Sequence, residues 1–401
     1  MIWGRSVTLV NVGGPQTFRS IRFTSKILAT DEPPRRGDTV VDLDGACVLP
    51  GLINAHDHLE LNHFGRLKFR ERYENAAEWI DDMRPQLAND PAIAAARRHS
   101  LTERLFIGAL KNLLAGVTTV AHHNPYYSEL RRTIPIRVIR RYGWAHSFAM
   151  EGQPAGARGE PGGEVAQRWR RTSADVPFMV HLAEGVDEDA EGELARLDAA
   201  GCLGPNTVIV HGVAIDPEGL RRLGATGASL VWCPASNMFL FGRTAAIRFL
   251  LERPGDGAVA LGSDSRLTGA NDLLDELREA RRTGCASPSE LLAMVTTSAA
   301  RVLKLKHAGQ LAIGSPADLI VVPNRADSLG ESLLEARRAD VGLVVVGGRP
   351  MVGEPRFQPV FDSRRVTTRP IVVDGQPRLA ESALARRIAG CPITEPGVAV
   401  R

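Results

Sequence analysis

Hydrophobic and polar positions divide the chain into three parts. Residues 1–47 hold short apolar segments separated by Gly and Pro turns, among them SVTLVNV and TVVDLDG, and residues 305–401 return to this pattern with ADLIVV, VGLVVVGGRP and RPIVVDG. Short runs rich in β-branched residues and bounded by turn residues predict β-strands. Both ends of the chain are therefore expected to be β-rich, and neither end alone has enough strands to bury a face.

The middle of the chain, residues 48–304, alternates two kinds of pattern. Seven short apolar segments are typical of buried strands: LINAH, VTTVAHH, WAHSFAM, FMVHLAE, TVIVHGV, SLVWCP and AVALGSD. Amphipathic stretches such as DLLDELREARRTG lie between them and predict helices. Apolar strands separated by helices indicate an α/β fold with a parallel sheet covered on both faces, and at this length a (β/α) barrel is the leading interpretation.

An eighth strand, which a complete barrel needs, is not evident in the pattern. The segment from Glu151 to Ala174 contains EGQPAGARGEPGGE and predicts a surface loop followed by a short helix, where a reduced eighth unit could lie. The basic runs RVIRRYG and RWRRTS are interpreted as solvated helix faces.

Composition and charge narrow the class of protein. With 44% hydrophobic residues among 401, the chain can bury a sizeable core. Its 49 basic and 46 acidic residues give a net charge of +3, which favours a small-molecule substrate over nucleic acid or a membrane surface. No apolar run approaches the ~20 residues of a membrane span and no leader pattern is seen, so a cytoplasmic location is expected. The five cysteines form no CxxC pair, which argues against a disulfide framework or a thiolate zinc site.

Histidines gather where the predicted strands end. These residues are His56, His58, His122, His123, His181 and His211, joined by Asp264 at the last strand. The carboxyl ends of parallel strands form one face of a barrel, so these residues are expected to converge on one pocket. His56 and His58 stand at i and i+2 of one strand and point the same way, whereas Asp57 points to the opposite face. Neutral imidazoles with one carboxylate suit zinc or iron(II) and leave a position open for water.

Several motifs together resemble the amidohydrolase superfamily, and within it the cytosine-deaminase-like branch that includes triazine hydrolases and guanine deaminases. LPGLINAHDHL is similar to the family's opening Pro-Gly-x-x-x-x-His-x-His, AGVTTV to its second strand, HLAE to its His-x-x-Glu, and GSDS to its terminal Asp motif. GQLAIGSPADLIVV is similar to the strand pair that closes the family's β-sandwich. The resemblance implies a distorted (β/α)8 barrel over residues 48–304, with a composite β-sandwich made from residues 1–47 and 305–401.

The resemblance also assigns roles to residues of the site. The positions that match the ligands of a single divalent metal, zinc in the first place and iron(II) as the alternative, are His56, His58, His181 and Asp264. Glu184 matches the acid/base, and His211 matches the histidine that polarises the water or the substrate. Asp264 is also expected to take the proton of the attacking water.

Two features separate this chain from other members of the superfamily. Members with two metals commonly bridge them by a carboxylated lysine, but no lysine lies between Lys111 and Lys304, which excludes such a bridge in the central and later strands. The stretch from Thr119 to His181 is also shorter than the branch leads us to expect, so one β/α unit is expected to be compressed there.

Three further residues are candidates for substrate contact. AHHNPYY places His122 and His123 after the second predicted strand, and one of them is expected to touch the substrate, with loop packing as the alternative. WCPASNMFLFG resembles the branch's Cys-Pro-x-Ser-Asn segment, so Asn237 is expected to shape the pocket while Cys233 is interpreted as core. The other histidines, His63, His99, His146 and His307, are interpreted as structural.

Hydrolysis of a C–N bond other than a peptide bond is the activity that the resemblance implies. The first hypothesis is deamination of an amino-substituted nitrogen heterocycle by a metal-activated water, because the His-x-x-Glu pair is the acid/base device of the branch. Opening of a cyclic amide or imide with the same residues is the second hypothesis. A metal-binding scaffold without turnover is the third, and the complete set of catalytic positions argues against it. Relatives are often oligomeric, so a homo-oligomer is a further possibility.

Overall fold

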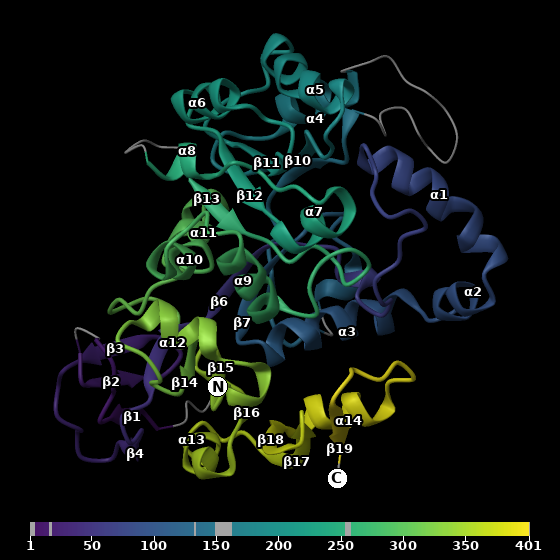
Figure 1. The fold of residues 1–401 in the computed structure, drawn as a ribbon. Coiled ribbons are helices and arrows are strands. Elements are labelled where there is room, and N and C mark those ends of the chain that lie inside the picture. The colour runs from purple at the N-terminus through teal and green to yellow at the C-terminus, as the bar shows by residue number, and fades with distance from the viewer. Residues whose placement is uncertain (1–4, 16–17, 132–133, 149–162, 253–257, 401) are drawn as a thin grey trace.

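A computed structural model describes residues 5–15, 18–131, 134–148, 163–252 and 258–400 (Figure 1). The parallel strands and their helices occupy the middle of the chain, and mainly antiparallel strands from both chain ends lie together at one side (Figure 1). In the described part of the chain, no helix combines the length and the apolar character needed to cross a bilayer.

In the described residues, the middle of the chain has eight parallel strands in two sheets. The three-stranded sheet has the order β6-β7-β8, formed by Leu52–Asp57, Val117–His122 and Arg137–Val138. The five-stranded sheet has the order β9-β10-β11-β12-β13, formed by Gly143–Ala145, Phe178–Leu182, Thr207–His211, Ser229–Trp232 and Val259–Leu261. All neighbours in both sheets pair in parallel. The expected α/β class with parallel strands is confirmed, although hydrogen-bonded ladders between the described residues do not close the two sheets into one cylinder.

The eighth strand, which the hydrophobic pattern does not reveal, is β8. Its two residues, Arg137 and Val138, pair with Thr119 and Val120 of β7. The interpretation of RVIRRYG as a solvated helix face was therefore wrong, because two paired residues are too few to produce a periodicity. Strand β9 begins at Gly143 with no helix in between, which is the compression expected between Thr119 and His181. Residues 151–162 of the predicted Gly/Pro-rich loop lie outside the described residues, and a helix follows at Gly163–Arg171.

Strand β13 ends against strand β6. The Asp264 amide donates a hydrogen bond to the His56 carbonyl over 3.1 Å. A Cβ atom on Gly262 would lie 2.6 Å from the Cβ of His56, so glycine is what permits this close approach. The contact places the last strand's carboxylate next to the first strand's histidines.

Most helices lie with the parallel strands, whereas α13 and α14 contact strands from the chain ends. Their bounds are α1 Ala76–Asn89, α2 Pro91–Arg97, α3 Leu101–Leu114, α4 Gly163–Arg171, α5 Glu188–Ala199, α6 Pro217–Ala225, α7 Pro234–Phe241, α8 Arg248–Leu251, α9 Leu273–Arg282, α10 Pro288–Met294, α11 Thr297–Val302, α12 Leu329–Glu335, α13 Gln358–Ser363 and α14 Ser382–Gly390. Short 3-10 turns occupy Leu59–Leu61, Ser128–Arg131, Arg338–Asp340 and Pro355–Phe357.

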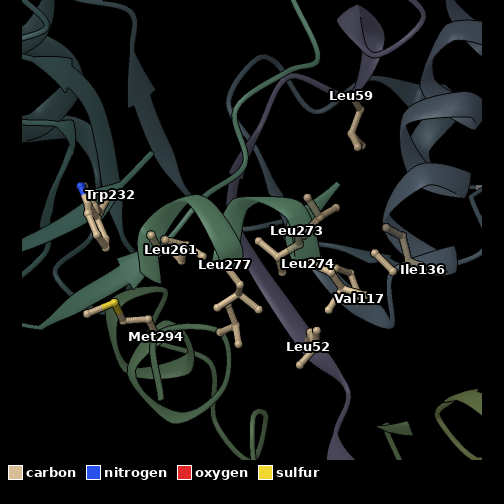
Figure 2. Packing of buried hydrophobic residues seen from close by; sticks show 14 of the residues in the cluster. Leu52, Leu59, Val117, Ile136, Trp232, Leu261, Leu273, Leu274, Leu277 and Met294 are labelled. Carbon is tan, nitrogen blue, oxygen red and sulfur yellow. The ribbon is translucent and has the colours of Figure 1, made fainter. Parts of the chain in front are cut away.

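The apolar stripe of α9 shows how the helices dock. The carboxylate of Asp272 caps this helix by accepting from the amides of Leu274 and Asp275. Leu274 and Leu277 of α9 belong to the same hydrophobic cluster as Leu52 of β6 (Figure 2). Burial of such leucines, worth roughly 1.5–3 kcal/mol per side chain, fixes the helix on the sheet.

The β-rich ends form two further sheets. The four-stranded sheet has the order β3-β2-β1-β4, formed by Ile27–Thr30, Ser20–Phe23, Val7–Val10 and Thr39–Asp42. The seven-stranded sheet has the order β19-β17-β18-β16-β15-β14-β5, formed by Val398–Val400, Thr368–Val373, Gln376–Glu381, Arg349–Gly353, Leu343–Val346, Leu319–Val322 and Cys47–Pro50. Strand β5 therefore pairs with a strand from the other end of the chain. Val7 and Leu9 share one buried cluster with Leu319 and Phe361, so the two ends bury each other's apolar faces.

Candidate active site

Three histidines meet at the ends of β6 and β10. The imidazole nitrogens of His56, His58 and His181 lie within 4.8 Å of one another. His56 and His181 are buried, and Nε2 of one lies 3.3 Å from Nε2 of the other. Burial, reinforced by the neighbouring imidazoles, holds the pKa of both histidines well below the ordinary value. Both are therefore neutral at physiological pH, the form that binds metals.

Asp264 supplies a carboxylate to the same cluster. Its Oδ1 lies 3.8 Å from Nε2 of His56 and 3.7 Å from Nε2 of His58. The Asp264 side chain is oriented by hydrogen bonds from the Ser265 amide (2.7 Å), the Ser236 hydroxyl (2.9 Å) and the Thr268 hydroxyl (2.8 Å). Burial alone would raise the pKa of Asp264, but the nearby histidines and these hydrogen bonds hold it below the ordinary value.

Hydrogen bonds of His123 and His181 to backbone carbonyls determine which ring nitrogens of His56 and His181 carry a proton. Nε2 of His123 lies 2.8 Å from the carbonyl oxygen of Ala145, which can only accept, so His123 carries its proton there. Nδ1 of His123 is then an acceptor for Nδ1–H of His56 at 3.3 Å. His181 donates its Nδ1–H to the His146 carbonyl over 3.1 Å.

The consequence is that the Nε2 atoms of His56 and His181 both present lone pairs across 3.3 Å. Two facing lone pairs repel each other unless a cation lies between them. Imidazole and carboxylate donors are those of a zinc or iron(II) site, so the donor set fits a divalent metal.

Glu184 and His211 form a second pair beside the cluster. Oε1 of Glu184 lies 3.4 Å from Nε2 of His211. Nδ1 of His211 lies 2.8 Å from Oδ1 of Asn237, and an amide oxygen can only accept, so Nδ1 carries a proton. Burial raises the pKa of Glu184. A carboxyl with a raised pKa next to an imidazole can both take and give a proton.

Backbone strain is concentrated at the same place. Ala183, His211 and Asp264 have φ values of 53°, 74° and 50°, in the left-handed region that non-glycine residues seldom adopt. The Ala183 conformation is held in part by its amide, which donates to Oε2 of Glu193 over 2.6 Å. Such strain is a recurrent feature of catalytic sites, because the surrounding fold must impose it.

A cavity of about 310 Å³ opens onto these groups. Five of the strand-end or acid/base residues line it: His58, His181, Glu184, His211 and Asp264. Its apolar wall includes Leu61, Ala76, Ala77, Trp79, Ile80, Leu240 and Leu267. The volume is at the small end of ligand sites, which favours a ligand about the size of a base or nucleoside.

The three candidates for substrate contact, His122, His123 and Asn237, are all fully buried and are absent from the cavity lining. His122 accepts from the Leu59 amide on Nδ1 over 3.3 Å, and His123 contacts His56. Asn237 contacts His211. These contacts favour positioning of the reactive histidines over direct contact with a ligand.

Asp57 lies on the other side of β6, as the strand alternation predicts. Its Oδ1 accepts from Asn62 and its Oδ2 from Asn112, both over 2.7 Å, and Nζ of Lys111 lies 3.1 Å from Oδ2. Asp57 and Lys111 are fully buried, so this ion pair anchors β6 to α3 behind the cluster.

Several residues of the cavity were not found from the sequence. His146, which was interpreted as structural, lines the cavity, as do Asn124 and Glu193. For His146, its place in the third predicted strand segment, WAHSFAM, was a usable signal, because four of the other predicted strands carry histidines at their ends. Glu193 carries no such signal, since it lies inside helix α5 among other acidic residues.

Comparison with known proteins identifies the family. The family model described as "Amidohydrolase family" matches residues 47–376. The chain belongs to this family. The expected resemblance is confirmed, and with it the hydrolase class.

Individual relatives agree with the family assignment. A 5-methylthioadenosine/S-adenosylhomocysteine deaminase of Syntrophobacter fumaroxidans is 29% identical over 80% of this chain and 84% of its own length. An 8-oxoguanine deaminase of Pseudomonas aeruginosa is 34% identical over 43% of each chain. Among solved structures, the zinc complex of atrazine chlorohydrolase from Arthrobacter aurescens has a TM-score of 0.68 at 19% identity, covering 89% of this chain and 99% of that one. The fold of this amidohydrolase is thus shared across nearly its whole length.

Proposed function

We propose that this amidohydrolase deaminates an amino-substituted nitrogen heterocycle with a metal-activated water. The observation that carries the proposal is the pairing of Glu184 with His211 at 3.4 Å, in the same cavity as His58, His181 and Asp264. Relatives named as deaminases support it. The complete set of acid/base residues and ligands argues against a scaffold without turnover.

His56, His58, His181 and Asp264 would hold one divalent metal, zinc or iron(II). When bound, such an ion acidifies its water so that hydroxide is present near neutral pH. The named zinc complexes of solved relatives favour zinc.

The residues of this chain divide the proton work. Asp264 accepts the proton of the attacking water. His211, whose Nδ1–H is held by Asn237, would stabilise the charge that develops on the attacked carbon's new oxygen when its Nε2, which faces Glu184, also carries a proton. Glu184 carries a proton to the ring nitrogen or the departing amine, which leaves as ammonia. Burial raises the pKa of Glu184, which favours the protonated form that this transfer needs.

The fold that positions these groups is inferred to be one distorted (β/α)8 barrel over residues 48–304. Support comes from the eight strands, all parallel to their neighbours, and from the contact of Asp264 with His56 that brings β13 to β6. Residues 1–47 and 305–401 would form a composite β-sandwich, supported by the pairing of β5 with β14 and by the shared apolar cluster.

Opening of a cyclic amide or imide is the alternative that the same residues allow. A single screen separates the two reactions. Zinc-loaded protein is incubated with purines, adenosine derivatives, pterins, pyrimidines and triazines while ammonia is measured, and with cyclic ureas and imides while ring absorbance is followed. Ammonia release with the ring intact supports deamination. Loss of ring absorbance without ammonia would replace it by ring opening.

A further inference from the structure

Acidic side chains are common in the lining of the cavity, although burial raises the pKa of Glu184 and raises that of Glu193 to about 7, so that the charge of Glu193 is complete only above neutral pH. Four of its lining residues are acidic: Glu184, Asp189, Glu193 and Asp264. Among the described residues that line it, none is a lysine or an arginine. Glu184 and Asp264 have roles in the proposed reaction, whereas Asp189 and Glu193 do not. The hydrogen bond from the Ala183 amide accounts for the position of Glu193 but not for its charge, and Asp189 has no role in the reaction.

Glu193 and Asp189 both belong to the first half of helix α5. Glu193 is 9% exposed, and its Oε2 is engaged by the Ala183 amide at 2.6 Å. Asp189 lies in the first turn of α5, is exposed and lines the cavity at its rim. One carboxyl group therefore lies in the wall of the cavity and the other at its opening to solvent.

Cationic side chains near the cavity are directed elsewhere. The Arg196 guanidinium lies 4.4 Å from the ring centroid of Phe148. Nζ of Lys68 donates to the carbonyl oxygens of Glu71 (2.6 Å) and Phe239 (3.1 Å). Neither cation lines the cavity, although both lie next to chain segments that do. Arg196 is near enough to offset part of the charge of Glu193, but neither Arg196 nor Lys68 lines the cavity, where an anionic group of a ligand would need a direct partner.

The geometry points to a substrate that is neutral or cationic, and we propose that Glu193 and Asp189 reject a nucleoside-sized heterocycle carrying a carboxylate or phosphate. This inference rests on the proposed deamination and makes its substrate class more specific. A bound metal would be the strong cation of the site, and the reacting carbon of the substrate must lie beside it. An anion elsewhere in the cavity loses its hydration and is repelled by like charges.

Three probes that differ mainly in one group test the charge preference. They are 5′-deoxyadenosine, which is neutral, 5′-amino-5′-deoxyadenosine, which is cationic, and adenosine-5′-carboxylate, which is anionic. Each is titrated calorimetrically into zinc-loaded protein, with KM used where a probe is turned over, and ammonia is measured in parallel. We expect the anionic probe to bind at least ~100-fold more weakly than the neutral one, and the cationic probe to bind as tightly or more tightly.

Charge-removing variants identify the residues. Glu193→Gln keeps a side-chain oxygen that can accept from the Ala183 amide, and Asp189→Asn has a similar shape. Each should strengthen binding of the anionic probe ~10-fold and weaken that of the cationic probe. Glu191→Gln and Glu188→Gln are matched controls, because these residues lie in the same helix but do not line the cavity.

The outcomes separate this inference from the proposed function. Equal binding of the three probes, or binding of none, overturns the inference. Variants that leave the order of binding unchanged overturn the assignment to Glu193 and Asp189. Ammonia released from all three probes with equal KM values would support deamination and overturn the charge preference. The expected order of binding without ammonia from any probe would support the preference and count against deamination.

Discussion

Oδ1 of Asn237 lies 2.8 Å from Nδ1 of His211, and Nδ2 of the same amide donates to the Thr244 hydroxyl over 3.2 Å. The amide is therefore held from one side while it orients the imidazole from the other. Its position behind the cavity makes Asn237 a positioning residue that acts through His211.

Replacing Asn237 by alanine should release the His211 ring while the metal ligands stay in place. We expect kcat to fall about 10- to 100-fold, as for other residues that orient a functional imidazole, with metal content unchanged. Asn237→Asp keeps an acceptor at this position and should recover much of the rate. Parallel measurements of kcat and metal per chain decide the matter, and loss of metal in Asn237→Ala would contradict the assigned role.

Metal content should follow the proposed ligands. The purified protein is expected to carry about one zinc or iron per chain. His56→Ala and His181→Ala should lose it, whereas His211→Asn should keep the metal and lose rate. Elemental analysis checks all three variants. Two tightly held metals per chain, or a metal-free His211→Asn beside a loaded His181→Ala, would show that the ligand assignment is wrong.

Glu184→Gln tests the acid/base role directly. An amide has nearly the shape of the carboxyl group but cannot transfer its proton, so activity should fall by ~10²–10⁴-fold while metal and fold are retained. Asp264→Asn should be worse, because it weakens a ligand and removes the proton acceptor together. The measurement is rate per mole of bound metal. Near wild-type turnover per metal in Glu184→Gln would remove Glu184 from the mechanism.

Glu276 should make the stability depend on pH. This fully buried residue of α9 accepts from the amides of Ala235 (2.8 Å) and Ala270 (3.3 Å), and burial raises its pKa to about 8. A carboxyl with a raised folded-state pKa stabilises the fold fully below its unfolded pKa of about 4.5, and this contribution is lost as the pH rises toward 8. The upper limit of the loss is about 5 kcal/mol.

Urea denaturation at several pH values measures this contribution. From about pH 5 to about pH 8, the free energy of unfolding should fall less in Glu276→Gln than in the wild type, because the amide does not ionise. Glu279→Gln, in the same helix at an exposed ion pair with Arg282, serves as the control and should follow the wild type. Identical slopes in all three proteins would exclude Glu276 as the cause.

Glu395 links the C-terminal segment to the loop that carries Asp264. The fully buried Glu395 carboxylate accepts from both guanidinium NH2 groups of Arg266, at 2.8 and 2.6 Å, and also from Arg338. Glu395→Gln should destabilise the protein by about 3–5 kcal/mol, because two arginines lose a buried counter-ion. Urea denaturation of Glu395→Gln is compared with that of Glu279→Gln, which removes the exposed ion pair with Arg282. An exposed pair contributes only about 0–1 kcal/mol to the free energy of unfolding. A loss as small as that of the exposed pair would contradict the prediction.

The sequence by itself determined the parallel α/β middle, the β-rich ends and the convergence of histidines on one face. These follow from local rules: alternation along a strand makes His56 and His58 point together, and parallel strands place all their carboxyl ends on one side. The same alternation turns Asp57 toward Lys111. Such patterns repeat every few residues, so they can be read from the chain without its tertiary structure.

Only the tertiary structure decided which residues stand behind the reactive ones. Strand β8 is recognisable by its pairing with β7 and not by its two residues. The contacts of His123 with His56, of Asn237 with His211 and of Glu193 with Ala183 depend on how loops and helices pack across the sheet. The two residues of each pair are separated along the chain by different numbers of residues, with no shared helical or strand period. Their proximity is a product of packing, which no local pattern encodes.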